Sequence, residues 1–447
     1  MTVNPTRRKL ILFAVLAGVS LIGLVLALPR IFNIDRYRPK VIAYLEEKLG
    51  KQVEIDRLTL DFFPLSLGIE NLNVKNPDGF LSGYIVKIGR IRADLDPRAL
   101  WHRQVVIRSL VLNHPAINLL SNPSGAWNFE NPKAKGSQRT FPLGLIYNVQ
   151  IEGGDLVAST LLPSGARGPV FFEAHEIYSN LEDVNLIGII SLSSSSASDG
   201  QGTVRASRLS FGTVDTENLA AGLQLEPRKA FFTDIKADVF GGSAMGDLSF
   251  DLSGTKTAFR TQVHFTGLRM EHLLSAFENG RGKMTGRMDG EVTLSGLVEP
   301  TVRPLAGLRG KGHITIRDGE APTLQLNANL KKLVRFNNLG PAKENPSAFN
   351  KISTDLELDN LHVTGKNIDI DGYGVDIDGS GSISVDGFNE VNCQGTAQIT
   401  APQGVLTNTF ARLAGGKLQN GRIFFPFRID GTVENPTFSK ATSAHKK

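Results

Sequence analysis

Apolar and polar residues alternate along most of this chain, and the alternation constrains its fold more than any other feature. Apolar positions recur at every second residue in short runs, and Gly, Pro, Asn or Asp separate the runs. In a β-strand, a period of two places one kind of side chain on each face. The pattern predicts a mainly β, mostly antiparallel structure of roughly 25 short strands, spaced at ~8–12 residues.

Helical spacing interrupts this pattern in a few places. In residues 35–49, Ile42, Leu45 and Leu49 recur at helical spacing, Pro39 suits a first turn, and Gly50 suits a stop. This helix either covers the start of the sheet, or lies on a membrane surface or closes one end of a groove. Shorter helical segments are expected at residues 96–101, 268–279, 324–336 and 405–413, and a Ser-rich linker or crossover at residues 188–202.

Residues 10–28 form the most apolar stretch, 19 residues without a charge after Arg7, Arg8 and Lys9. At ~1.5 Å per residue the stretch spans roughly 28 Å, close to the ~30 Å of a bilayer core. A cleaved signal peptide is the alternative, but its apolar region is shorter and ends in small residues. We expect an uncleaved anchor with the N-terminus in the cytoplasm. Its membrane-anchor residues are Leu10, Phe13, Leu16, Leu21, Leu24 and Leu28.

Composition and motifs argue against several classes of function. The single cysteine, Cys393, excludes an intrachain disulfide framework and a thiolate metal cluster. The 49 basic and 44 acidic residues are too balanced for a nucleic-acid-binding protein. The eight histidines are scattered, and the phosphate-loop and nucleophile-elbow motifs do not occur. We therefore expect no enzyme, no catalytic residue, no cofactor and no metal.

One acidic string imitates a calcium-binding loop. Asn367, Asp369, Asp371, Gly372 and Asp378 occupy its positions 1, 3, 5, 6 and 12. Such a loop begins with Asp, ends with Glu and is flanked by helices, whereas the residues around this string alternate as strands do. We expect the acidic residues on the solvent face of neighbouring strands, with a weak calcium contact as the alternative.

The order of these features resembles the AsmA family of Gram-negative envelope proteins. The resemblance is carried by the basic-flanked apolar stretch, by the helix that ends in Leu-Gly-Lys-Gln-Val, and by the alternating runs up to the Asn-Pro turn. These features lie within residues 7–80. Similar segments follow at residues 88–132, 149–159, 239–254, 284–296, 310–321 and 425–438.

The resemblance implies an inner-membrane anchor and a periplasmic body. That body would be a long, curled β-sheet with an apolar concave groove, related in architecture to chorein-type lipid bridges. Family members are associated with outer-membrane biogenesis, and no catalytic residues are attributed to them. The expected regions are a cytoplasmic N-terminus (1–9), the transmembrane helix (10–28), the amphipathic helix (29–50), two sheet regions (51–187 and 203–438) around the Ser-rich stretch, and a basic tail (439–447).

Lipid binding is the first functional hypothesis. Acyl chains offer no hydrogen bonds, so a surface along which they slide should lack unpaired polar groups. The alternative for the residues of such an apolar face is that they form a closed core. A non-enzymatic factor that binds outer-membrane proteins during targeting or insertion is the second functional hypothesis. The candidate groove lining is Leu58, Leu60, Phe62, Leu65, Leu67, Ile69, Leu110, Leu112, Ile117 and Leu119.

Overall fold

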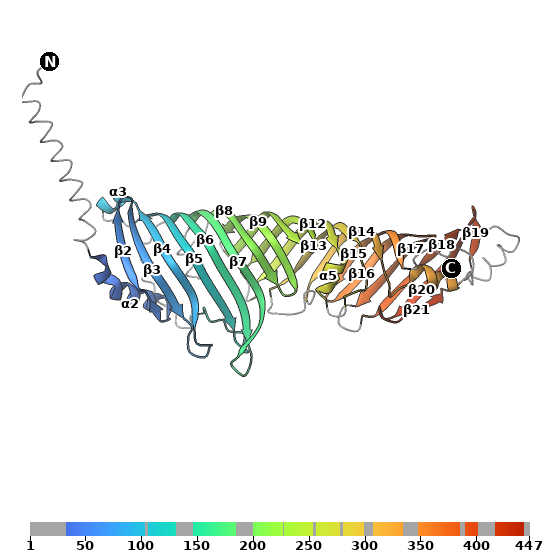
Figure 1. Cartoon of the computed structure of the whole chain (residues 1–447), viewed down its shortest axis with the longest axis horizontal. Coiled ribbons are helices and arrows are strands. Elements are labelled where there is room, and N and C mark those ends of the chain that lie inside the picture. Colours follow the sequence, from blue (N-terminus) through green and yellow to red (C-terminus); the bar gives the residue numbers. More distant parts are fainter. Residues whose placement is uncertain are drawn as a thin grey trace, which may run out of the picture. The chain divides into compact units, whose positions relative to one another are not determined.

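The protein is mainly β, with 21 strands in one sheet and few helices (Figure 1). No pairing among the described residues joins the first strands to the last, so the sheet is open. The structure is a computed structural model that describes residues 33–102, 106–130, 146–184, 200–226, 228–253, 256–277, 280–298, 307–333, 347–384, 389–400 and 416–441.

The chain divides into two compact units. Unit 1 is Met1–Ser207 with Leu223–Pro227, and unit 2 is Arg208–Gly222 with Arg228–Lys447. Strands β8 (Gly200–Phe211) and β9 (Val214–Glu226) contain residues of both. Unit 1 holds η1 (Ile34–Tyr37), α2 (Arg38–Leu49), β1 (Val53–Glu54), β2 (Arg57–Phe62), β3 (Leu65–Lys75), β4 (Tyr84–Leu95), α3 (Pro97–Trp101), β5 (Ile107–Ser121), β6 (Ile146–Leu161) and β7 (Arg167–Val184).

Unit 2 continues the strand order with twelve β-strands and two helices among its described residues. They are β10 (Lys229–Val239), β11 (Gly242–Asp251), β12 (Ala258–Arg269), α5 (Met270–Ser275), β13 (Arg287–Leu297), β14 (Arg309–Glu320), α6 (Leu326–Leu333), β15 (Ala348–Asp359), β16 (His362–Gly372), β17 (Val375–Ser384), β18 (Val391–Thr400), β19 (Lys417–Gln419), β20 (Arg422–Gly431) and β21 (Pro436–Lys440).

The strand pairing is antiparallel with one exception among the registers that the structure defines. β5 and β6 run parallel, with Leu110 opposite Val149. This pair is a parallel exception within a sheet that is otherwise antiparallel, as the mostly antiparallel expectation allows. Parallel neighbours need a crossover instead of a tight hairpin, and residues 122–145 make that connection.

The strands are fewer and longer than the alternation suggested. β5 joins the apolar positions at residues 107, 110–112 and 117–119, which resemble separate short strands in the sequence. Asn113 lies opposite Arg90 and Pro115 opposite Ile88, so pairing continues on both sides of His114. His114 has a φ of 49°. It therefore makes a local irregularity within one strand instead of a turn between two.

Helix α2 covers the beginning of the sheet, as one of the two interpretations of residues 35–49 expected. It ends at Gly50, whose φ of 64° permits the left-handed cap and whose N–H donates to the carbonyl of Glu46. Its apolar side packs on the buried face of β1 to β4. The contacting residues are Val41, Ile42, Leu45 and Leu49 of α2, and Val53, Ile55, Leu58, Leu72, Val74, Ile85 and Ile88 beneath them.

The other helical expectations are met in part. α3 lies within residues 96–101. α5 begins two residues after the start of its expected segment, because those residues belong to β12, and α6 begins two residues after the start of its segment; residues 278–279 and 334–336 lie outside the described residues. Residues 200–202 belong to β8, which shortens the expected linker, and residues 185–199 and 405–413 lie outside the described residues. The expected transmembrane segment, residues 10–28, also lies outside them. Within the part of the chain that the structure describes, no helix is long and apolar enough to span a membrane.

Candidate functional site

The strand registers of unit 1 bring the ten candidate lining residues to one face of the sheet. Leu58, Leu60 and Phe62 of β2 lie opposite Ile69, Leu67 and Leu65 of β3. Directly opposed residues of antiparallel strands share a face. The same face continues through Ile91 and Ala93 of β4 to Leu112 and Leu110 of β5. Val86 of β4 packs against the same cluster as Ile91 and Leu112 and lies opposite Ile117, and the period of two from Ile117 adds Leu119.

This face is only partly closed. Leu58 is 3% exposed and belongs to the cluster beneath α2, so the closed-core alternative holds for that residue. The other nine candidate residues are half-buried. Sheet cores that are sealed by a second layer bury such side chains almost completely. The face therefore has a closed end under α2 and a partly open remainder.

The opposite face of β3 and β4 is polar. Glu70 and Arg90 form an ion pair of 3.8 Å across β3 and β4, and Arg92 and Asp94 form one of 3.2 Å along β4. Buried small residues, Ser66 and Gly68, alternate with the leucines of β3. Because the charged side chains lie on the other face, the neighbours of the half-buried leucines on their own face are apolar.

Unit 2 contains a second half-buried apolar face, which the sequence analysis did not single out. Phe232 of β10 lies opposite Leu248 of β11, and Phe250 of β11 lies opposite Phe259 of β12. The rings of Phe232 and Phe250 meet edge to face with centroids 6.0 Å apart. The available signal was the enrichment of phenylalanine at alternating positions, with 25 Phe in the chain.

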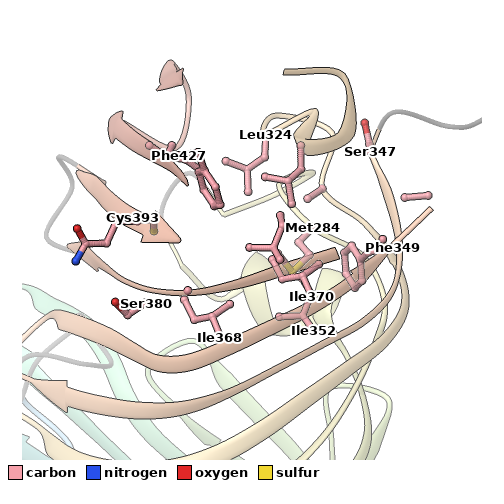
Figure 2. Close-up of a pocket in the computed structure, with 18 residues that line it drawn as sticks. Met284, Leu324, Ser347, Phe349, Ile352, Ile368, Ile370, Ser380, Cys393 and Phe427 are labelled. Carbon is pink, nitrogen blue, oxygen red and sulfur yellow. The ribbon is translucent and has the colours of Figure 1, made fainter. Parts of the chain in front are cut away.

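An apolar cavity of about 110 Å³ lies farther along unit 2 (Figure 2). Strands β15, β16 and β17 supply one side, where Ile352, Ile370 and Ile377 are cross-strand neighbours. Leu324 and Phe427 lie across the hollow from Ile368 and Ile370 (Figure 2). The complete lining is Met284, Ala321, Leu324, Leu326, Ser347, Ala348, Phe349, Ile352, Ile368, Ile370, Gly372, Ile377, Gly379, Ser380, Cys393, Gln394, Phe427 and Ile429.

Two hydrophobic cores, each with a helix packed on it, border this cavity. α6 places Leu330, which is 0% exposed, on the core formed by β17, β18 and β20. α5 packs on a second core that includes Phe265, Met288 and Phe349. The cavity lies where these two cores meet, at Ile370, which packs against both. An engineered apolar cavity of ~150 Å³ stays dry and takes a benzene molecule, so this one suits a segment of an acyl chain and not a whole lipid.

Among the described residues that line the cavity, Cys393 is the only one with a titratable side chain. Burial raises the pKa of its thiol above the ordinary value, and the nearby Asp430 carboxylate acts in the same direction. The thiol is therefore protonated at neutral pH and behaves as a small apolar group.

The acidic string at residues 367–378 lies on β16 and β17, on a solvent-facing side, as expected. Asp369 lies opposite Asp378, and Asp371 opposite Asp376. Each carboxylate has a polar or basic partner on another strand of the sheet, which offsets the repulsion between them. The partners are Lys351 for Asp369, Arg422 for Asp376, Gln398 for Asp378 and Asn350 for Asp371. Within the described residues, no group of three or more His, Cys, Asp or Glu is arranged to hold a metal ion.

The sequence comparisons give the N-terminal part of the chain a family. Residues 6–141 match the model of the AsmA family. This match confirms the resemblance for residues 6–141, which include α2 and β1 to β5 and hence the ten candidate lining residues; the similar segments farther along the chain lie outside it. The AsmA family is not known as an enzyme family. No curated protein matches the chain.

Proposed function

We propose that the protein binds phospholipid acyl chains on the apolar face of its open sheet and conducts them along it. The observation that carries this proposal is the half-buried state of nine candidate residues that share one face of unit 1. Acyl chains fit such a face because they need no hydrogen bonds and gain from leaving water. The phenylalanine face and the cavity of unit 2 offer the same chemistry.

The proposal also covers where in the cell the protein lies and whether it is an enzyme. Residues 10–28 would anchor the chain in the inner membrane, with the sheet in the periplasm and a role in outer-membrane biogenesis. The curled, groove-like form of the sheet belongs to the same proposal. The protein would act without catalysis, because transfer of a lipid between membranes makes and breaks no covalent bond.

Photocrosslinking tests whether lipid occupies the face. We expect photoreactive groups at Leu60, Leu67 and Leu112 of the full chain to capture phospholipid, identified by mass spectrometry. Capture of protein alone, with no phospholipid in the purified protein, would contradict lipid binding. That result would instead favour the second hypothesis, a factor that assists the targeting or insertion of outer-membrane proteins.

A matched pair of variants separates an open face from a closed core. Leu67→Asp places a carboxylate on the apolar face of β3. Asn73→Asp places the same charge on the opposite face, between Lys87 and Glu54 of the neighbouring strands, because the positive φ of Asn71 shifts the alternation and turns Leu72 and Val74 to the apolar side. We expect Leu67→Asp to lower the amount of lipid that co-purifies severalfold while the melting temperature stays close to that of Asn73→Asp. Unfolding of Leu67→Asp alone would mean that the face is a closed core.

A further inference from the structure

Two aromatic side chains at one edge of unit 1 are the most exposed large apolar residues in the described part of the chain. Trp101, the last residue of α3, is 88% exposed, and Phe63, in the turn between β2 and β3, is 78% exposed. Soluble surfaces seldom present a tryptophan so fully, because its ring gains from burial. Neither residue belongs to the apolar face or the cavity.

The sheet topology places the two residues at the same edge of unit 1, the one formed by the ends of the strands where β2 turns into β3 and where β4 ends. β2 pairs with β3 through Phe62 and Leu65, so the turn with Phe63 lies at that end of the hairpin. Ser66 of β3 lies opposite Asp94 of β4, so the following segment with α3 projects from the same edge. With strands ~4.8 Å apart, the two turns are separated by about two strand spacings, roughly 10 Å. Figure 1 shows α3 at the edge of the sheet beside the end of β2.

We propose that this edge of unit 1, with Phe63 and Trp101 as its tips, inserts into the interfacial region of a phospholipid bilayer. Trp and other aromatic side chains collect at that depth, where the ring meets lipid while its polar atom stays near water. Phe63 projects from a turn and Trp101 from the end of α3. A bilayer surface can accept such projecting residues, whereas a protein partner needs a matching pocket.

The chain's own path supports a bilayer as the partner. The expected membrane segment ends at Leu28, five residues before Asn33. Those residues reach at most about 17 Å. From there, the carboxylate of Asp35 accepts a hydrogen bond of 2.9 Å from the backbone N–H of Leu58, which fixes η1 beside β2. Phe63 lies five residues along the chain from Leu58, roughly 17 Å in a strand.

Charge plays a small part in this contact. Asp96 forms a 2.9 Å ion pair with Arg108, and Asp94 is paired with Arg92. Within the described residues, Arg98 and Asp61 lack an ion pair at this edge, and their charges are opposite. The proposal therefore predicts binding to neutral phosphatidylcholine about as strong as to anionic lipid.

The two tryptophans of the chain provide a built-in control. Trp127 forms a bridge with Ser121, at the other end of β5 from α3. β5 extends over ~45 Å, from its 14 residue-to-residue steps of roughly 3.3 Å. Trp127→Phe leaves Trp101 as the one tryptophan and keeps a ring next to Phe171, and Trp101→Phe leaves only Trp127.

The experiment inserts each full-chain variant into vesicles of phosphatidylcholine whose acyl chains carry bromine, which quenches tryptophan fluorescence on contact. We expect the emission of Trp101 to be quenched by about half or more and shifted to shorter wavelength, as for a ring at the bilayer interface. The emission of Trp127 should change little. No quenching of Trp101, or equal quenching of both tryptophans, would overturn the proposal.

A double variant distinguishes insertion of this edge into a bilayer from lipid binding on the sheet face. In a Leu67→Asp, Trp127→Phe chain, quenching of Trp101 should persist although severalfold less lipid co-purifies with the protein. Loss of quenching together with the bound lipid would mean that Trp101 meets lipid on the sheet and not in a bilayer, and would overturn the edge contact. A photoreactive group at residue 101 that captures protein and no phospholipid would do so too.

Discussion

Cys393 reports on the cavity of unit 2 because it is the single cysteine of the chain and lines that cavity. Its raised pKa, caused mainly by burial, keeps the thiol protonated near neutral pH. The thiolate is the species that reacts with maleimides. Alkylation at a single site can therefore be followed by the mass of the intact protein.

We expect the folded protein to react slowly at pH 7, and the rate to rise about tenfold per pH unit as the thiolate fraction rises. The rise should continue to a higher pH than in the unfolded chain, because the folded pKa is the higher one. Added phospholipid should lower the rate at every pH. An equal rate with and without lipid would mean that no acyl chain enters the cavity.

Helices η1 and α2 protect the first edge of the sheet, where strands would otherwise present unpaired backbone groups. The Asp35 carboxylate accepts from the N–H of Leu58 at 2.9 Å, and the Glu46 carboxylate accepts from the N–H of Val53 at 3.0 Å. The Arg38 guanidinium donates to the carbonyl of Asp56. Side chains thus occupy positions that a neighbouring strand would take, which opposes association through this edge.

Loss of one of these contacts should destabilise unit 1. In Asp35→Ala, the N–H of the buried Leu58 loses its acceptor, and an unsatisfied buried group costs about 1–3 kcal/mol. Asp61→Ala, at an exposed position at the other end of β2, should change the free energy of unfolding by less than ~0.5 kcal/mol. Chemical denaturation of both variants measures the difference. Equal stabilities would mean that water replaces the carboxylate at this edge.

The alternation of residues was sufficient to predict the sheet, but not where its strands end. Leu65, Leu67 and Ile69 alternate with small or polar residues, so their common face follows from the sequence. His114 shows the limit, because a positive φ inside a paired strand has no separate sequence signal from a turn. The parallel pairing of β5 and β6 also escaped prediction, since strand direction depends on a connection whose path the sequence does not encode locally.

The candidate site, like the fold, was predictable from the sequence only in part. The ten lining residues share a face because alternation fixes it, whereas the coverage of Leu58 by α2 depends on packing between distant segments. The cavity was not predictable, because its lining comes from residues 284–429 and depends on how α6 and Leu324 pack over β15 to β18. Such contacts have no periodicity in the sequence.

Conduction of lipid makes a stronger demand on the protein than binding does. A bound acyl chain needs one apolar face, and each unit has a half-buried one of its own. A chain that travels must pass every position on its path. A carboxylate on the path must lose part of its hydration as the acyl chain passes, and an added barrier of ~1.4 kcal/mol slows passage tenfold.

We therefore expect Leu67→Asp in unit 1 and Phe250→Asp in unit 2 each to slow phospholipid transfer between donor and acceptor vesicles by about tenfold or more. Each variant should still retain part of its co-purified lipid, because the other unit keeps its apolar face. Ser249→Asp, on the other face of β11 and opposite Arg260, is the control for unit 2 and should transfer lipid normally. Normal transfer by Phe250→Asp would place unit 2 off the path, and the protein would then hold lipid without conducting it through both units.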